Sequence, residues 1–374
     1  MPHDFTTEYA QNVVDGNIVA GKKIIQACQR HLNDLKRAKS DDYEFHFVPE
    51  EASKIVNFIE ILPDPDSGKE LKLAPFQKWL LGSLYGWRFK DDNSRRFSRA
   101  LISMARKQGK TVIVSAIGSY ELLAGNYPER NRQILFTSNA IKQARIGYEM
   151  MQDQFRLISK KSKTIRKRIK VLDKEIKDQL SNSKARAMAS DSSTMDGFAP
   201  TVAVIDEFHE SRDTKMYDVL KSGMIRQKNG LLAIISTAGL NLNVPMYAEY
   251  KYLDKVLNGE VESERYFIAI YEQDSEEEIH KPELWEKSNP LLCIPEGRKT
   301  AIDNIQDDLK KGLDEDNING VLVKNFNMWR QASEDSYMSG RDWDKCLVKE
   351  PVDIRGKSVY FGVDLSKNDD LTSV

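Results

Sequence analysis

Residues 99–123 read RALISMARKQGKTVIVSAIGSYELL, and this stretch decides the fold. The apolar segment at residues 99–104 predicts a buried strand, and the apolar spacing of residues 111–123 predicts a helix. A short loop that ends in Gly-Lys-Thr joins them. This order of strand, tight loop and helix is the context in which backbone N–H groups and a helix N-terminus hold phosphate groups.

Six loop residues are therefore candidate nucleotide ligands: Arg106, Lys107, Gln108, Gly109, Lys110 and Thr111. In such a loop Lys110 would reach the β- and γ-phosphates of ATP, and the Thr111 hydroxyl would ligate Mg²⁺. The first glycine of the usual pattern is replaced by Met104. Taken alone, Gly-Lys-Thr also suits an ordinary helix start, so the interpretation depends on the rest of the chain.

An acidic pair follows a second apolar segment. Residues 201–205 predict a buried strand that ends at Asp206 and Glu207. In nucleotide hydrolases a carboxylate at such a strand end holds Mg²⁺, and a following Glu polarises the attacking water. Asp206 is thus a candidate metal ligand and Glu207 a candidate catalytic residue. A solvated helix cap would use the same residue types, but the phosphate loop upstream favours catalysis.

Small and hydroxyl residues follow a third apolar strand, predicted at residues 231–236. They are Ser236, Thr237, Ala238 and Gly239, here called the coupling motif. Such residues near the γ-phosphate can sense its loss and pass the change to a neighbouring element. An ordinary turn would explain them in isolation, but the order of the three strand-end motifs favours coupling.

Two residues upstream of the loop are candidates for recognising the base. The Gln77 amide can both donate to and accept from an adenine edge, and the neighbouring Phe76 ring can stack on the base. Alternatively, Phe76 and Trp79 at helical spacing are core positions.

Basic residues raise two further possibilities. Arg106, Arg212 and Arg226 are candidates for stabilising charge on the γ-phosphate, although Arg212 and Arg226 are equally consistent with surface arginines. The dense basic run at residues 160–170 can contact DNA phosphates without sequence preference, or it can be a solvated face.

Composition excludes several classes of protein. With 374 residues, 40% of them hydrophobic, the chain can form one large domain with a subdomain, or two domains. The net charge of -1 does not indicate a polyanion partner by itself, and three cysteines without a CxxC spacing argue against a disulfide framework or zinc site. A signal peptide and a long apolar run are both absent, so we expect no membrane association.

Short strands that alternate with helices predict an α/β fold. Further elements are a strand at residues 133–137 and a helix at residues 141–155. With the phosphate loop, the pattern predicts a P-loop NTPase with a mainly parallel central sheet flanked by helices, plus a small helical subdomain. We expect an N-terminal helical lead-in at residues 1–70, an ATPase core at residues 71–255, and a helical linker or lid at residues 256–350. Near residue 358 a new strand begins and ends at Asp364.

Taken together, these motifs resemble the large terminase subunits of tailed bacteriophages. The resembling segments are residues 19–34, 75–77, 106–111, 205–209, 236–239, 362–366 and 370–372. The resemblance implies an adenine-contacting Gln77, a phosphate-binding Lys110, magnesium-linked Thr111 and Asp206, a catalytic Glu207, and a coupling role for residues 236–239.

The same resemblance makes residues 357–374 the start of a truncated RNase H-like nuclease domain, with Asp364 as its first metal ligand. We expect one carboxylate to be insufficient for two-metal cleavage. The implied partners are double-stranded DNA, a capsid portal protein, the small terminase subunit and further copies of the chain in a ring on the portal. The implied location is the cytoplasm of an infected bacterium, outside the mature virion.

Two other functions remain open at this point. A helicase-like or repair DNA translocase would share the ATPase motifs but would carry a second motor domain, which the strand ending at Asp364 does not resemble. A degenerate nucleotide-binding scaffold would explain Met104, but the intact Lys110, Thr111, Asp206 and Glu207 argue against it.

Overall fold

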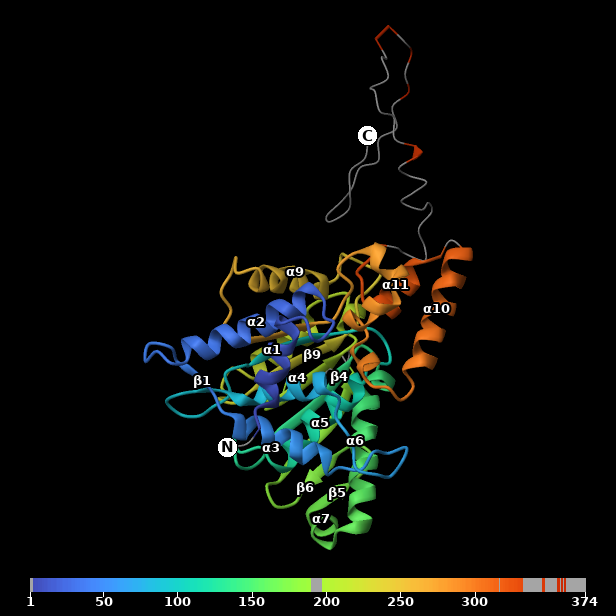
Figure 1. The fold of residues 1–374 in the computed structure, drawn as a ribbon. Coiled ribbons are helices and arrows are strands. Elements are labelled where there is room, and N and C mark those ends of the chain that lie inside the picture. The colour runs from blue at the N-terminus through green and yellow to red at the C-terminus, as the bar shows by residue number, and fades with distance from the viewer. Residues whose placement is uncertain are drawn as a thin grey trace. The chain divides into compact units, whose positions relative to one another are not determined.

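An eight-stranded sheet organises the chain (Figure 1). The computed structural model describes residues 3–189, 197–315 and 317–331, and in addition Lys345, Cys346, Arg355, Gly356, Ser358 and Tyr360. The strands lie in the order β10-β3-β9-β8-β4-β7-β6-β5. Their bounds are β3 Arg99–Ser103, β4 Gln133–Ser138, β5 Ile169–Val171, β6 Ile176–Asp178, β7 Ser183–Ala189, β8 Val202–Asp206, β9 Leu231–Ser236 and β10 Tyr266–Ile270.

The strands that carry the predicted motifs are parallel neighbours. β9 pairs with β3 on one side and β8 on the other, with Ser103 opposite Ser236 and Ile205 opposite Ile234. Strands β10 to β7 are all parallel, and β6 pairs antiparallel with β7 and β5. Because parallel strands end at the same edge, the loops after β3, β8 and β9 meet there. The predicted fold class, a mainly parallel P-loop sheet flanked by helices, is confirmed.

Side chains alternate between two hydrophobic clusters along each central strand. Ala100 and Ile102 of β3 belong to one cluster, and Leu101 between them belongs to the other. This period of two places one cluster on each face of the sheet. Both faces are therefore covered, as a parallel sheet requires.

Helices and short elements surround the sheet. The helices are α1 Phe5–Val14, α2 Lys22–Arg37, α3 Pro49–Glu60, α4 Pro75–Gly86, α5 Lys110–Leu123, α6 Ile141–Lys161, α7 Lys163–Arg168, α8 Lys215–Gly223, α9 Pro245–Leu257, α10 Arg298–Asp314 and α11 Asn319–Phe326. A two-stranded ribbon joins β1 Phe45–Phe47 to β2 Trp87–Phe89, and 3₁₀ turns occur at η1 Phe208–Glu210, η2 Glu276–His280, η3 Pro282–Lys287 and η4 Pro290–Cys293. Within the described residues no helix is long and apolar enough to cross a membrane.

A small helical subdomain follows β10. Its own hydrophobic cluster contains Trp285, Leu309 and Phe326, from η3, α10 and α11. In Figure 1 these helices are orange and lie beside the carboxyl ends of the central strands. The subdomain thus lies next to the edge where the motifs meet.

The structure corrects one assignment made from the sequence. Residues 266–270, which we assigned to the helical segment, form strand β10 of the main sheet, because a short apolar run does not distinguish a buried strand from a buried helix. The N-terminal helices contribute Tyr9, Ile24 and Cys28 to the same cluster as the sheet. The predicted strand at residues 358–363 and Asp364 lie outside the continuously described residues.

Candidate functional site

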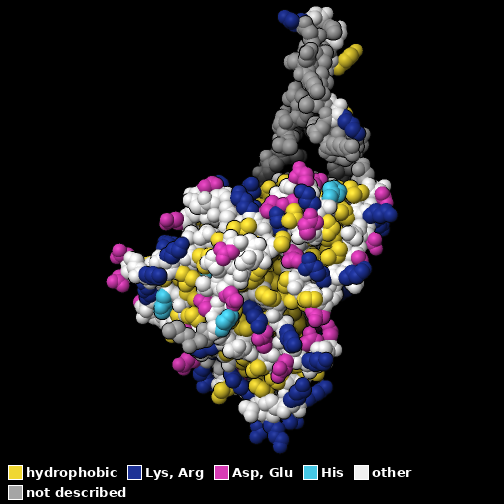
Figure 2. Space-filling model, in the orientation of Figure 1, with side chains coloured by type: hydrophobic (Ala, Val, Ile, Leu, Met, Phe, Trp, Pro, Cys, Tyr) yellow, Lys and Arg dark blue, Asp and Glu magenta, His cyan; other side chains and the backbone are white. Residues whose placement is uncertain are grey.

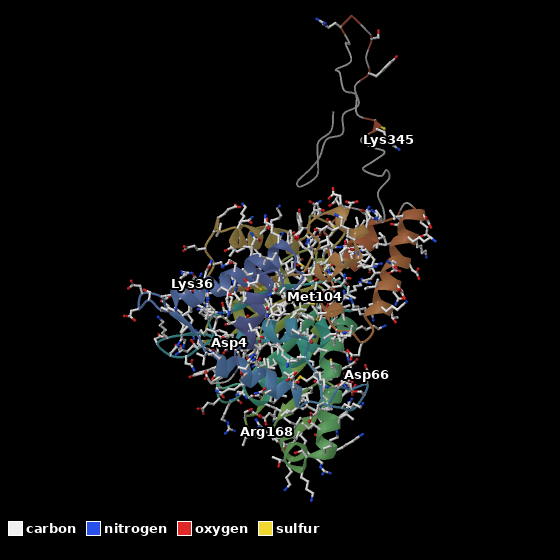
Figure 3. All side chains as sticks on the ribbon, in the orientation of Figure 1. Asp4, Lys36, Asp66, Met104, Arg168 and Lys345 are labelled. Atoms are coloured by element: carbon white, nitrogen blue, oxygen red, sulfur yellow. The ribbon has the colours of Figure 1, made fainter. Side chains whose placement is uncertain are left out.

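The phosphate loop joins β3 to α5 in a strained conformation. Lys107 and Gly109 both have positive φ, of 62° and 74°. A Cβ on Gly109 would lie 2.6 Å from the Gln77 amide nitrogen, so this position has no room for a side chain. Met104 is fully buried in the core and its N–H donates to Ser236 O at 3.2 Å (Figure 3). Met104 therefore extends the strand pairing, and the turn begins after it.

The Lys110 ammonium is held by the loop itself. Its Nζ donates to Met104 O at 3.2 Å and to Ala105 O at 3.0 Å. Burial lowers the pKa of Lys110, while Glu207 and Asp206 act in the opposite direction. The Lys110 ammonium is half-buried and contacts no carboxylate of the described residues directly, so a nucleotide phosphate would supply the negative charge it lacks.

The acidic pair lies at the tip of β8. Asp206 is the last residue of the strand, and Glu207 turns away with φ 51° and donates its N–H to Ile235 O at 3.2 Å. Burial and the adjacent Glu207 raise the pKa of Asp206 to about 7. Burial also acts to raise the pKa of Glu207, but the contact with His209 and the charge of Lys110 leave it below its usual value. The two carboxylates are therefore electrostatically distinct.

The residues present fit a bound Mg²⁺. Two adjacent half-buried carboxylates favour a divalent cation, and the buried Ser138 hydroxyl, which ends β4, has no partner among the described residues. Thr111 lies in the first turn of α5. The described residues contain no group of three or more His, Cys, Asp or Glu side chains that could hold a metal.

The coupling motif contacts the catalytic candidate directly. Thr237 Oγ1 lies 3.5 Å from Glu207 Oε2, and Ser236 Oγ lies 2.9 Å from His209 Nδ1. His209 Nδ1 is also 3.1 Å from Glu207 Oε2. With a proton on Nδ1, His209 donates to this carboxylate and fixes its orientation. From the sequence we assigned no catalytic role to His209, because its contacts depend on the left-handed turn at Glu207.

Gln77 faces the phosphate loop, whereas Phe76 is packed in the core. The Gln77 oxygen accepts from Ala74 N at 3.0 Å, and its amide nitrogen faces Gly109. Phe76 is 1% exposed, with its ring centroid 5.7 Å from that of Tyr271. In this conformation the Phe76 ring has no exposed face on which a base could stack. Phe76 is therefore a core residue, the alternative to base stacking that its helical spacing with Trp79 allowed. Gln77 reaches the phosphate loop.

Gln108 connects the loop to the helical subdomain. Its Nε2 donates to Asn289 Oδ1 at 3.0 Å, and its Oε1 accepts from Leu291 N at 2.9 Å. The N–H groups of Ala105 and Arg106 donate to Ser288 O and Lys324 O. The loop is therefore braced by residues far along the chain, and no sequence signal marked Asn289.

The candidate arginines occupy three different places. Arg106 is an exposed loop residue whose charge acts on Lys110 and Glu207. Arg212 is exposed beside Ser211, which donates to Asn139 at the carboxyl edge. Arg226 precedes β9 and is exposed at the amino edge. A six-residue strand is about 20 Å long, so Arg226 cannot act on a nucleotide in its own chain.

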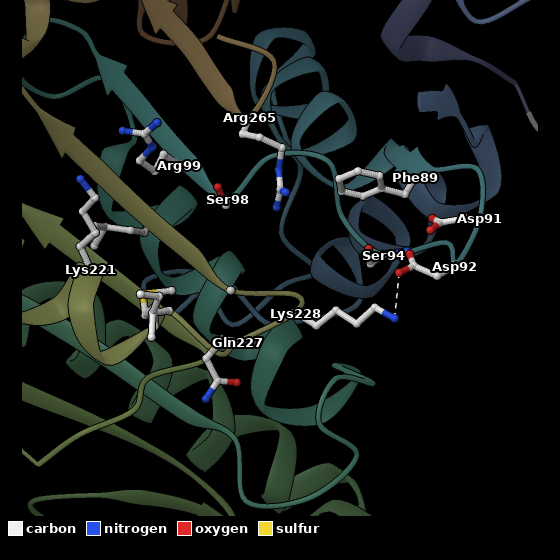
Figure 4. Close-up of a pocket in the computed structure, with 14 residues that line it drawn as sticks. Phe89, Asp91, Asp92, Ser94, Ser98, Arg99, Lys221, Gln227, Lys228 and Arg265 are labelled. Carbon is white, nitrogen blue, oxygen red and sulfur yellow. Dashed lines mark hydrogen bonds and ion pairs between the residues drawn. The ribbon is translucent and has the colours of Figure 1, made fainter. Parts of the chain in front are cut away.

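Two cavities lie at opposite edges of the sheet. A cavity of about 350 Å³ lies between the phosphate loop and α10, lined by Arg106, Gln108 and Leu291 among others. A larger one of about 560 Å³ lies at the amino edge, where Arg99, Arg265, Lys221 and Lys228 surround it and Lys228 pairs with Asp92 at 2.8 Å (Figure 4). The larger cavity is remote from the acidic pair, so size alone does not mark the reactive site.

Comparisons with known proteins agree with this geometry. The family model for the ATPase domain of terminase large subunits matches residues 75–255, and the model for their endonuclease domain matches residues 260–374. The second match takes in β10 and the helical subdomain. Asp364 falls within it but outside the described residues.

Individual relatives are similar over different lengths. The terminase large subunit of Enterobacteria phage HK97 is 26% identical over 329 residues, which cover 86% of this chain and 61% of the relative. Protein YmfN of Escherichia coli K12 is 28% identical over 181 residues, covering 48% and 39%. The crystal structure of the HK97 bacteriophage large terminase matches with a TM-score of 0.62 and 22% identity, covering 79% of this chain and 58% of that chain. The chain thus spans less than two thirds of the length of each.

Proposed function

The chain belongs to the terminase large subunit family, and from this premise we propose that it hydrolyses ATP with Mg²⁺ to drive double-stranded DNA into a procapsid. One observation carries the proposal. The loop with Lys110, the acidic pair and the coupling motif meet at one sheet edge, with Thr237 in contact with Glu207. A plain nucleotide-binding scaffold does not require that contact.

The side chains divide the work of hydrolysis. Lys110, freed from the carbonyls of Met104 and Ala105, binds the phosphates. Thr111 and Asp206 would hold Mg²⁺, which would supply positive charge at the phosphate oxygens. The Glu207 carboxylate, oriented by His209, accepts a hydrogen bond from the attacking water through its second oxygen. Gln77, whose amide nitrogen faces Gly109, would contact the nucleotide from the α4 side of the loop.

Phosphate release from ATP tests this proposal. The chain should release phosphate with Mg²⁺ and double-stranded DNA present, and release should stop when EDTA removes the metal. Turnover that survives EDTA, or complete inactivity of a folded preparation in which ATP does not bind, would overturn the proposal.

DNA contact is proposed for the basic run at α7. Lys160, Lys163, Arg166, Lys167 and Lys170 are all exposed and form no ion pair with a described residue. Figure 2 shows Lys and Arg side chains, in dark blue, at the lower end of the view, where Figure 1 places α7. Unpaired cations release counterions when they meet phosphates, which favours binding without sequence preference.

A matched pair of double variants tests the DNA surface. The DNA association constant falls as salt rises, and Arg166→Glu with Lys167→Glu should make the slope of its logarithm against log salt less negative by about 2. Lys36→Glu with Lys39→Glu, at exposed positions near the end of α2, should leave it unchanged. Equal losses in both pairs would argue against a specific surface.

The remaining partners follow from the proposed packaging role. They are a capsid portal protein, the small terminase subunit and further copies of the chain in a ring, within the cytoplasm of the infected bacterium. A ring offers Arg212 or Arg226 a neighbouring site. Mixing an Arg212 or Arg226 variant with Glu207→Gln should restore part of the turnover if that arginine acts on a neighbour. The metal-binding role of Asp364 stays a prediction.

A further inference from the structure

Asn327 ties three strand ends to the helical subdomain. It follows α11, has φ 54° and is 1% exposed. Its Oδ1 accepts from Ala238 N at 2.7 Å, and its Nδ2 donates to Ser103 Oγ at 2.9 Å and to Tyr271 O at 2.8 Å. Ser103 ends β3, Tyr271 follows β10, and Ala238 belongs to the coupling motif. One buried amide therefore bonds to all three.

The residues after Asn327 continue along the coupling motif. Arg330 N donates to Gly239 O at 3.2 Å, and the Gln331 side chain accepts from Leu242 N at 2.8 Å. A Cβ on Gly239 would lie 3.0 Å from Trp329 Cζ3 and 3.3 Å from His209 Cβ. Gly239 is thus packed between these two rings, and His209 in turn contacts Glu207.

These contacts form a continuous path from the catalytic candidate. His209 and Trp329 both border Gly239 closely, so a displacement of His209 bears on Gly239 and, through it, on Trp329. A displacement of Ala238 must either break its hydrogen bond to Asn327 or move the end of α11 with it. Breaking it would leave a buried N–H unpaired, which is costly, so movement of the helix is favoured.

We propose that Asn327 is a positioning residue that passes the nucleotide-dependent state of the coupling motif to residues 319–331. The inference rests on the proposed ATPase function. It assigns Asn327 no contact with nucleotide. The left-handed backbone at residue 327 suits Asn and Gly, so Asn327→Gly removes the side chain and its hydrogen bonds without adding backbone strain.

Hydrogen exchange with and without Mg²⁺ and ATPγS tests the inference on the full chain. In the unmodified protein, nucleotide should slow exchange both at residues 104–115 and at residues 319–331. In Asn327→Gly the slowing at residues 104–115 should persist, and the slowing at residues 319–331 should fall to less than about a third of its size in the unmodified protein. The matched control is Asn182→Gly, another left-handed asparagine, in the turn between β6 and β7, where both effects should persist.

Each outcome has a defined meaning. The inference would be overturned if nucleotide still slows exchange at residues 319–331 in Asn327→Gly. It would also be overturned if, in the unmodified protein, nucleotide slows exchange at residues 104–115 but not at residues 319–331. Absence at both regions in the unmodified protein would instead overturn the proposed function. If Asn327→Gly does not fold, Trp329→Ala, which removes the contact with Gly239 outside the amide network, should give the same loss.

Discussion

The two edges of the central sheet use left-handed backbone in different ways. Among the described residues, six non-glycine positions have positive φ: Lys107, Glu207 and Asn327 lie at the carboxyl edge, and Asn93, Asn131 and Asn182 lie in the turns that precede β3, β4 and β7. Asparagine adopts this conformation at low cost, whereas lysine and glutamate do so only when the surroundings impose it. Strain in unfavourable residue types therefore coincides with the chemistry.

Replacing the strained carboxylate should have the largest effect. Glu207→Gln should lower kcat for ATP about 10³-fold, because an amide cannot act as the base that orients and polarises water. Nucleotide affinity should change little, since Lys110 and Asp206 remain. The matched control is Glu210→Gln, three residues on and exposed. Turnover of Glu207→Gln within a few-fold of the unmodified protein would remove Glu207 from the mechanism.

A buried histidine away from this edge should control stability without affecting catalysis. Trp87 Nε1, which can only donate, lies 3.0 Å from His31 Nδ1, so His31 is neutral and its Nε2–H donates to Thr7 Oγ1 at 3.0 Å. Burial lowers the pKa of His31 to about 4. The unfolded chain takes up this proton near pH 6.5, so the stabilisation is present above that pH and is lost as pH falls towards 4.

The loss should reach at most about 3 kcal/mol in the free energy of unfolding. Urea unfolding at pH 7.5 and pH 5 measures it, with His31→Gln as the variant that does not titrate. The unmodified protein should lose more stability than His31→Gln between these pH values. Equal losses in the two proteins would contradict the assigned neutral state.

The smallest effect tests the strain itself. Lys107→Gly should raise the free energy of unfolding by about 0.5–1 kcal/mol, because glycine adopts positive φ without steric cost. Asn182→Gly should change it by less, since asparagine already tolerates that conformation. A larger gain at residue 182 than at residue 107 would break the distinction between the two kinds of position.

The sequence predicted the strands and loops whose signals are local. The strand at residues 231–236 agrees with β9, and the helix at residues 141–155 was six residues shorter than α6. The phosphate loop and the acidic pair could be found because each follows an apolar strand directly. β10 was missed because its five apolar residues carry no flanking turn signal that separates a strand from a helix.

The bracing of the site could not be predicted. Asn289 contacts Gln108 and Asn327 contacts Ser103, and both asparagines lie far along the chain from these partners, so their roles depend on tertiary packing alone. Phe76 shows the converse, because its aromatic chemistry allowed base stacking while its burial places it in the core. Local chemistry identifies candidates, and packing decides which of them face the site.

The most direct test of the account is the affinity for ATPγS with Mg²⁺ in three forms of the chain. The account places nucleotide at the carboxyl edge and leaves the larger amino-edge cavity free. Lys110→Ala should therefore weaken binding about 100-fold, because the cation that binds the phosphates is lost. Lys221→Ala with Lys228→Ala, which removes two cations from the amino-edge cavity, should leave affinity within about twofold. Binding that survives in Lys110→Ala and fails in the amino-edge double variant would contradict the account.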